Sequence, residues 1–79
     1  MNPRVQQLTN LPIYKLKLRF ENGETGIFDF SKYLNYPIYE PLLDEAYCKK
    51  ARVFNGTVSW DDVVDFDPDA LYVESDRKN

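Results

Sequence analysis

Three aspartates at alternate positions, Asp65, Asp67 and Asp69, form the densest group of potential metal ligands in the 79-residue chain. Carboxylates that converge on one point can bind Ca²⁺, which prefers oxygen ligands. In an EF-hand loop that begins at Asp65, the sixth position would be Ala70 instead of glycine, and the twelfth would be Asp76 instead of glutamate. The EF-hand pattern therefore fails, and we interpret Asp67 and Asp69 as caps of a local turn.

The residues needed for common enzyme sites are missing. The sequence contains no histidine and one cysteine, Cys48. Without histidine the chain lacks the commonest general base near neutral pH, and triads built on Ser-His or Cys-His are excluded. One cysteine also excludes an internal disulfide and a thiolate zinc site of the usual kind. We therefore predict a non-catalytic protein without cofactor or metal, in which Cys48 is a buried structural thiol.

A row of three cations, Lys15, Lys17 and Arg19, lies in the segment from Tyr14 to Phe20. Apolar residues fill the positions between the cations, which is the period-two pattern of a strand with one buried face. The cations must then share the solvent face, where they form a candidate basic face for phosphates or an acidic partner. We weigh this interpretation below the simpler one, a solvated sheet face.

Tyrosine and tryptophan gather in the middle of the chain, and these residue types are enriched at protein interfaces. Core packing is the simpler interpretation for each of them, although a domain this small must leave some of them partly exposed. The aromatic residues in question are Tyr33, Tyr36, Tyr39, Tyr47 and Trp60.

Charge is distributed unevenly along the chain. The net charge is -3, which argues against nucleic acid as the main partner. Residues 1–20 carry four bases and no acid, whereas residues 61–76 carry seven acids and no base. Acids beside exposed aromatic residues suit a basic protein partner. The candidate interaction surface therefore consists of Tyr36, Tyr39, Trp60, Asp61, Asp62 and Asp65.

The elements that must position these residues are two hairpins. Asn22-Gly23 follows the basic strand, and Asn55-Gly56 separates two shorter runs of β-branched and aromatic residues. Asn-Gly favours a two-residue type I′ turn, because both central positions of that turn need positive φ. A two-residue loop in the first hairpin places Leu18 opposite Ile27, so that Ile27 joins the core face.

The length allows one domain, residues 1–79, and we expect order over about 1–74 with a frayed polar tail at 75–79. We predict an α+β fold with a mainly antiparallel sheet of four to six strands and one or two short helices. No segment has the apolar length of a signal peptide or a membrane span, so we expect a cytoplasmic protein. An exposed sheet edge would permit homodimerisation.

Residues spread over nearly the whole chain form a pattern that is known from one protein family. They are Asn2-Pro3-Arg4-Val5, Tyr14-x-Leu16-x-Leu18-x-Phe20-Glu21-Asn22-Gly23-Glu24, Phe28-Asp29, Tyr33-Leu34, Ile38-Tyr39-Glu40-Pro41-Leu42, Val53, Trp60 and Asp65-x-Asp67-Pro68-Asp69-x-Leu71-Tyr72. In order and spacing they resemble the bacterial family called domain of unknown function 2442. The chain departs from that family at Asp61-Asp62-Val63, where members commonly have a Pro-Asn-Gly-like turn.

The resemblance implies an α+β fold, shared with the N-terminal domain of longer proteins that continue into a helix-turn-helix, and no established catalytic activity. Members of the family are often encoded beside another small uncharacterised protein, and some are suspected antitoxins, so the resemblance also implies a protein partner from a neighbouring gene. The present sequence shows no helix-turn-helix, so DNA binding is not carried over.

We predict a non-catalytic protein-interaction module, the antitoxin-like member of a two-protein pair, whose partner is the product of a neighbouring gene. The alternative is a nucleic-acid-associated accessory domain that uses Lys15, Lys17 and Arg19. A small enzyme and a weak cation site in the acidic C-terminal third rank below both, and no membrane partner is expected.

Overall fold

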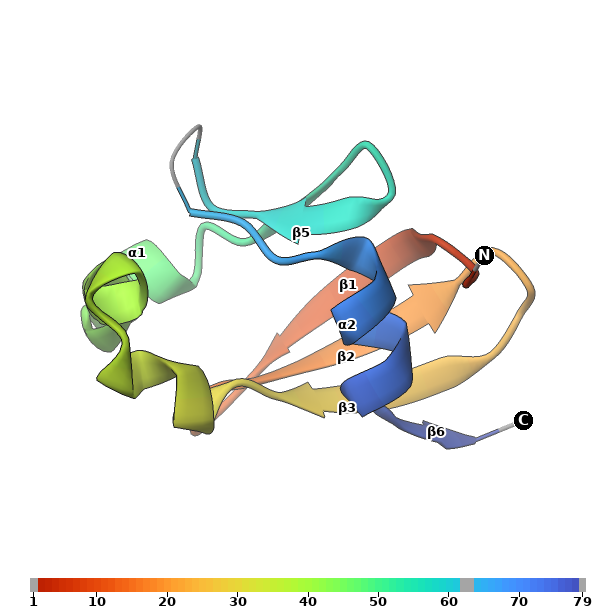
Figure 1. Cartoon of the computed structure of the whole chain (residues 1–79), viewed down its shortest axis with the longest axis horizontal. Coiled ribbons are helices and arrows are strands. Elements are labelled where there is room, and N and C mark those ends of the chain that lie inside the picture. The colour runs from red at the N-terminus through yellow and green to blue at the C-terminus, as the bar shows by residue number, and fades with distance from the viewer. Residues whose placement is uncertain (1, 62–63, 79) are drawn as a thin grey trace.

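The computed structural model describes residues 2–61 and 64–78, and within them the chain forms two antiparallel sheets with short helices (Figure 1). The elements are β1 (Val5–Leu11), β2 (Lys15–Phe20), β3 (Thr25–Asp29), the 3₁₀ helices η1 (Ser31–Asn35) and η2 (Pro37–Leu43), α1 (Glu45–Cys48), β4 (Arg52–Phe54), β5 (Thr57–Ser59), α2 (Pro68–Glu74) and β6 (Asp76–Lys78). One sheet has the order β1-β2-β3-β6, and the other pairs β4 with β5. The predicted α+β class is confirmed.

Strand β2 is the centre of the larger sheet. Its alternating sequence buries Leu16, Leu18 and Phe20 completely and leaves its cations on the other face. On one side β1 places Leu8 opposite Leu18, and on the other side β3 places Phe28 opposite Leu16. The strand therefore carries both the core and the basic face.

The loop between β2 and β3 has three residues, not the two that were predicted. The N–H of Phe20 donates to the carbonyl of Glu24 over 2.8 Å, and the N–H of Gly23 donates back to the carbonyl of Phe20 over 2.9 Å. Gly23 has a φ of 88°, whereas Asn22 is not in the left-handed region and accepts the Glu24 N–H with its side chain at 3.0 Å. A type I turn followed by a left-handed glycine has these features.

The longer loop shifts the β2–β3 register by one residue from the prediction. Leu18 lies opposite Gly26, and Ile27 lies opposite Lys17 on the solvent face. The prediction that Ile27 faces the core was therefore wrong, because Phe28 takes the core position instead. The second hairpin does match: Asn55 and Gly56 have φ values of 51° and 79°, as a type I′ turn requires.

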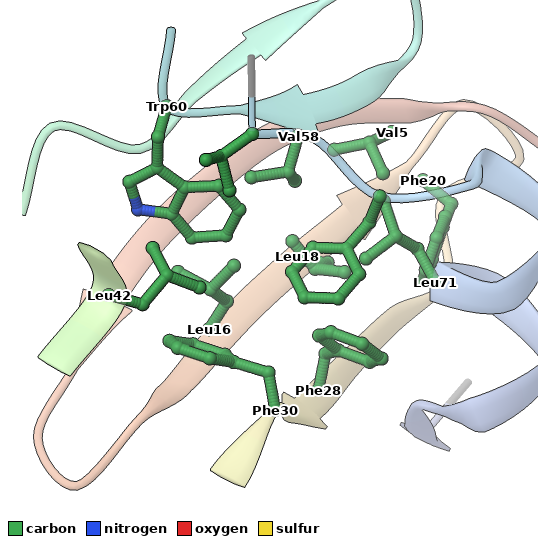
Figure 2. Packing of buried hydrophobic residues seen from close by; sticks show 12 residues of the cluster. Val5, Leu16, Leu18, Phe20, Phe28, Phe30, Leu42, Val58, Trp60 and Leu71 are labelled. Atoms are coloured by element: carbon green, nitrogen blue, oxygen red, sulfur yellow. The ribbon is translucent and has the colours of Figure 1, made fainter. Parts of the chain in front are cut away.

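Both sheets, η2 and α2 contribute to one aromatic-rich core (Figure 2). Trp60 lies between the sheets, where its ring meets Phe30 edge-on at a centroid distance of 5.7 Å and Phe66 at 5.5 Å. Its indole N–H donates to the carbonyl of Cys48 over 2.8 Å, which satisfies the buried polar atom. The buried hydrophobic residues are Val5, Leu16, Leu18, Phe20, Phe28, Phe30, Leu42, Val58, Trp60, Val64, Phe66 and Leu71.

Aspartates begin the short α-helices, as their positions in the sequence indicate. Asp44 accepts the Ala46 N–H at 2.9 Å in front of α1, and Asp67 accepts the Asp69 N–H at 3.2 Å in front of α2. The capping interpretation of Asp67 is thus confirmed. None of the helices in residues 2–61 and 64–78 has the length and apolar character needed to cross a membrane.

The outer edge of β1 is flanked by another part of the same chain. The Asn10 side chain donates to the carbonyl of Lys49 over 3.3 Å, and the Val5 N–H donates to the carbonyl of Gly56 over 2.9 Å. The segment between Lys49 and Gly56, which includes β4, therefore runs beside β1 in the opposite direction. This contact protects one of the two sheet edges through which homodimerisation could occur.

The polar C-terminal residues form strand β6 on the edge of the sheet, where a frayed tail was expected. Gly26 makes this packing feasible, since a Cβ there would lie 2.9 Å from Ser75 Oγ and 3.0 Å from Arg77 Cγ. Arg77 also lies over the Tyr72 ring at 3.9 Å from its centroid. The sequence alone did not show this strand, because backbone pairing at an edge requires no apolar residues.

We expect Gly26→Ala to destabilise the protein by about 1–3 kcal/mol, because the added methyl group overpacks the contact with Ser75. Urea unfolding followed by circular dichroism measures the change. The second substitution Ser75→Gly removes two of the three atoms nearest to the added methyl group and leaves only Cγ of the flexible Arg77 side chain, so the double variant should be more stable than Gly26→Ala alone. Equal stability of the two variants would contradict the proposed packing.

Candidate functional site

The basic face lies on the larger sheet, opposite the core. Cross-strand neighbours share a face, and the register pairs Lys17 with Thr9 on β1 and with Ile27 on β3. Lys17 and Arg19 are exposed and Lys15 is half-buried. The three predicted cations thus form one row along the middle of an uncovered sheet face.

Few acids accompany the basic row on this face. Asp29 lies opposite Lys15 at one end. Two hydrogen bonds from Ser31 hold the pKa of the Asp29 carboxyl below its usual value, with a smaller contribution from the charge of Lys15. Among the described residues, no carboxylate oxygen lies within 4 Å of a charged nitrogen of Lys15, Lys17 or Arg19. The cations are therefore available to an anion from solution.

The five described residues of the predicted interaction surface do not form one surface. Trp60 is 4% exposed and belongs to the core. Tyr39 is half-buried, because its ring stacks on Phe66 at 4.7 Å with an angle of 10° between the planes. Its hydroxyl donates to the carbonyl of Asp65 over 3.3 Å, whereas the Asp65 side chain is exposed. Tyr36 is 57% exposed.

Asp61 is engaged by its own chain. Its carboxylate accepts the hydroxyl of Tyr47 at 2.6 Å and the backbone N–H of Val64 at 3.0 Å, so it links α1 to Val64. The neighbouring Asp62 lies outside the described residues. In the described part of the chain, no three Asp, Glu, Cys or His side chains are placed to share a metal ion.

Two exposed apolar residues that sequence reasoning missed, Ile38 and Leu43, lie on η2, close in the chain to the predicted Tyr36. Three large apolar side chains are more than half exposed there, at 57% for Tyr36, 56% for Ile38 and 53% for Leu43. Glu40 and Asp44 join Leu43 around a shallow hollow of the same segment. We call these five residues the η2 surface. Two prolines keep the segment in a 3₁₀ helix, so its side chains do not follow the α-helical period that would have predicted which ones are buried.

A groove of about 500 Å³ lies between the β1–β2 turn and α1. Its lining residues are Asn10, Leu11, Pro12, Ile13, Tyr14, Glu45, Cys48 and Lys49. Cys48 is half-buried in this wall, so its thiol is less buried than the predicted structural thiol. Partial burial, and to a smaller extent the charge of Glu45, raises the pKa of the Cys48 thiol. The thiol is therefore protonated near neutral pH, as the absence of an activating base implies.

Comparison with known families agrees with the residue pattern. The family model described as "Protein of unknown function (DUF2442)" matches residues 5–77, from the first residue of β1 into β6. The chain belongs to this family. No curated protein and no solved structure matches the chain significantly. Membership of the DUF2442 family therefore assigns no function to the candidate surfaces.

Two other tyrosine hydroxyls of the DUF2442 chain also donate to carboxylates that lie far away in the sequence. Tyr33 donates to Glu74 at 2.6 Å, and Tyr72 donates to Glu24 at 2.5 Å. The first bond ties η1 to α2 and the second ties α2 to the β2–β3 loop. These acids and Asp61 therefore serve the fold, while Asp65 remains an acid with an exposed side chain.

Spectrophotometric titration of tyrosinate should show Tyr33 and Tyr47 ionising late, because desolvation and hydrogen bonds to carboxylates raise the pKa of each to about 12. The pKa in the folded protein is above the unfolded value of 10, so the stabilisation is present below pH 10 and is lost as the pH rises through about 12. We expect Asp61→Asn to lower the pKa of Tyr47.

Tyr47→Phe identifies the transition of Tyr47, and Asp69→Asn is the matched control because it removes an acid without touching a tyrosine hydroxyl. An unchanged Tyr47 transition in Asp61→Asn would show that the hydrogen bond is absent in solution.

Proposed function

We propose that this protein is a non-catalytic protein-interaction module that binds a basic protein through the η2 surface. In its most specific form, the proposal makes the chain the antitoxin-like member of a two-protein pair. The observation that carries it is the exposure of Tyr36, Ile38 and Leu43 on one short segment.

Exposed apolar side chains of this size suit an interface. Scattered single apolar residues are normal on a protein surface, whereas η2 and the residue before it expose three large ones within eight positions. Two prolines in η2 limit the backbone freedom of the segment, so binding would cost little ordering entropy. Tyrosine adds a large ring with a polar tip, which is typical of residues that dominate binding energy.

The charges of the η2 region indicate the kind of partner. Residues 36–46 contain three acids, Glu40, Asp44 and Glu45, and no base. Asp65 adds another exposed acid near η2. Its backbone carbonyl accepts a hydrogen bond from the hydroxyl of Tyr39, which belongs to η2. An acidic surface accelerates encounter with a basic protein. If the partner handles RNA, these carboxylates would compete with RNA phosphates for its cations.

Co-expression with the product of the neighbouring gene, followed by size exclusion with light scattering, tests the proposal. We expect a single complex of defined mass. The double substitution Tyr36→Ser with Leu43→Ser should weaken that complex at least tenfold. Truncation of a hot-spot residue commonly costs about 2 kcal/mol or more of binding free energy.

Val73→Ser is the matched control, because Val73 is an apolar residue on α2 that is 62% exposed. Two separate peaks for the unmodified pair would contradict the antitoxin-like form of the proposal. Equal loss of binding in Val73→Ser and in the η2 variant would contradict the assignment of the surface.

A second candidate function is binding of nucleic acid by the basic face. The supporting observation is that Lys15, Lys17 and Arg19 lie in one row without an ion-pair partner among the described residues. Alternate residues of a strand are about 6.8 Å apart, so the row presents regularly spaced cations to a chain of phosphates. The described strand residues that share this face include no aromatic side chain for base stacking, so we expect binding without sequence preference.

Fluorescence anisotropy with labelled single-stranded RNA at increasing salt concentration tests this function. We expect affinity that falls steeply with salt, and the double substitution Lys17→Glu with Arg19→Glu should abolish it, because each phosphate contact releases counterions. The control is the double substitution Lys32→Glu with Lys50→Glu, which changes the net charge by the same amount at two positions outside the row. Salt-independent binding, or equal loss in both variants, would exclude the basic face as the site.

A further inference from the structure

We propose that the groove at the β1–β2 turn is the interface of a homodimer, in which Ile13 of each copy enters the groove of the other. The groove lies between the turn and α1, and Ile13 is one of the residues that line it. The interface is distinct from the η2 surface and the basic face.

Ile13 is an unusual residue for an exposed turn. Its φ is 62°, a left-handed conformation that β-branched residues rarely adopt, and its side chain is 79% exposed. The next residue, Tyr14, also has a positive φ of 57°, but its ring packs on Phe30 at 6.0 Å and its carbonyl accepts the Phe30 N–H. Positive φ at two consecutive residues belongs to the tight turn itself, and packing within the chain holds the Tyr14 ring while the Ile13 side chain stays exposed.

A two-fold dimer supplies the missing contact. An isologous interface requires a surface patch that is complementary to itself. Here the apolar projection, Ile13, stands beside an apolar hollow whose walls include Leu11, Pro12 and Tyr14. A two-fold axis near Ile13 would place each isoleucine over the hollow of the other copy.

The charges around the groove are also complementary to themselves. Glu45 and Lys49 line the same wall and form an exposed ion pair of 3.2 Å within one copy. A surface with one acid and one base can meet its two-fold copy with Glu45 facing Lys49 in both directions. A groove for a strongly charged partner would instead carry charges of one sign.

The groove is a better candidate for a dimer interface than either edge of the larger sheet. Segment 49–56 flanks β1, and β6 is only three residues long and consists of charged residues. Eight residues line the groove, which is a small interface, so we expect a weak dimer that forms reversibly with concentration.

Sedimentation equilibrium from about 10 μM to about 1 mM covers the range in which such an interface should dissociate. We expect a monomer–dimer equilibrium in the unmodified protein. Ile13→Asn should weaken the dimer at least tenfold. Asparagine tolerates the left-handed conformation, so the same variant should melt roughly 4–8 °C higher at concentrations where both proteins are monomeric. A merely structural role of Ile13 would lower the melting temperature instead.

Charge exchange gives a second, independent test. Glu45→Lys and Lys49→Glu should each weaken the dimer, because each puts like charges across the two-fold axis. The double variant, Glu45→Lys with Lys49→Glu, restores opposite charges and should recover most of the association. Phe54→Asn is the control for Ile13→Asn, because Phe54 is an exposed apolar residue on β4, outside the groove.

A monomer at every concentration would overturn the proposal, as would a dimer that Ile13→Asn leaves intact. If the chain stays monomeric and Ile13→Asn instead weakens a complex with the neighbouring gene product, the groove belongs to that interface and the homodimer is wrong. Failure of that complex alone would contradict the proposed function and leave the dimer standing.

Discussion

The alternation of apolar and basic residues in β2 is the constraint on which the rest of the structure depends. Leu16, Leu18 and Phe20 can enter the core only if Lys15, Lys17 and Arg19 emerge on the other face. A slip of one residue would bury three cations, which costs far more than the marginal stability of a small domain. The register of β2 is therefore fixed, and β1 and β3 must follow it.

Aromatic side chains complete the hydrophobic core on the buried face of β2. Trp60 and Phe66 join the second hairpin to the main sheet, and tyrosines at the margin of the core end in hydroxyls that donate to carboxylates. Such residues bury large rings while their polar tips remain satisfied. A chain of 79 residues thereby builds a continuous core. The carboxylates of Glu24, Asp61 and Glu74 stabilise the fold by accepting these hydrogen bonds.

Sequence reasoning succeeded where a residue pattern maps directly on a backbone geometry. Asn55-Gly56 formed the expected type I′ turn, because both residues adopt positive φ. The same dipeptide at Asn22-Gly23 did not, because the Asn22 side chain accepts the Glu24 N–H and favours a longer loop. The length of this loop depends on a local hydrogen bond that the composition does not reveal. Because the loop length was mispredicted, the strand register of Ile27 was mispredicted as well.

The surfaces were harder to predict than the core. Trp60 and Tyr36 have similar chemistry, yet only tertiary packing decides that the first is buried and the second exposed. Strand β6 depends on the missing Cβ of Gly26, and the left-handed Ile13 has no signature in the sequence. The flanked edge of β1 and the short charged β6 have a further effect. Both features disfavour edge-to-edge pairing with other chains, which is the first step of open-ended β-sheet fibres.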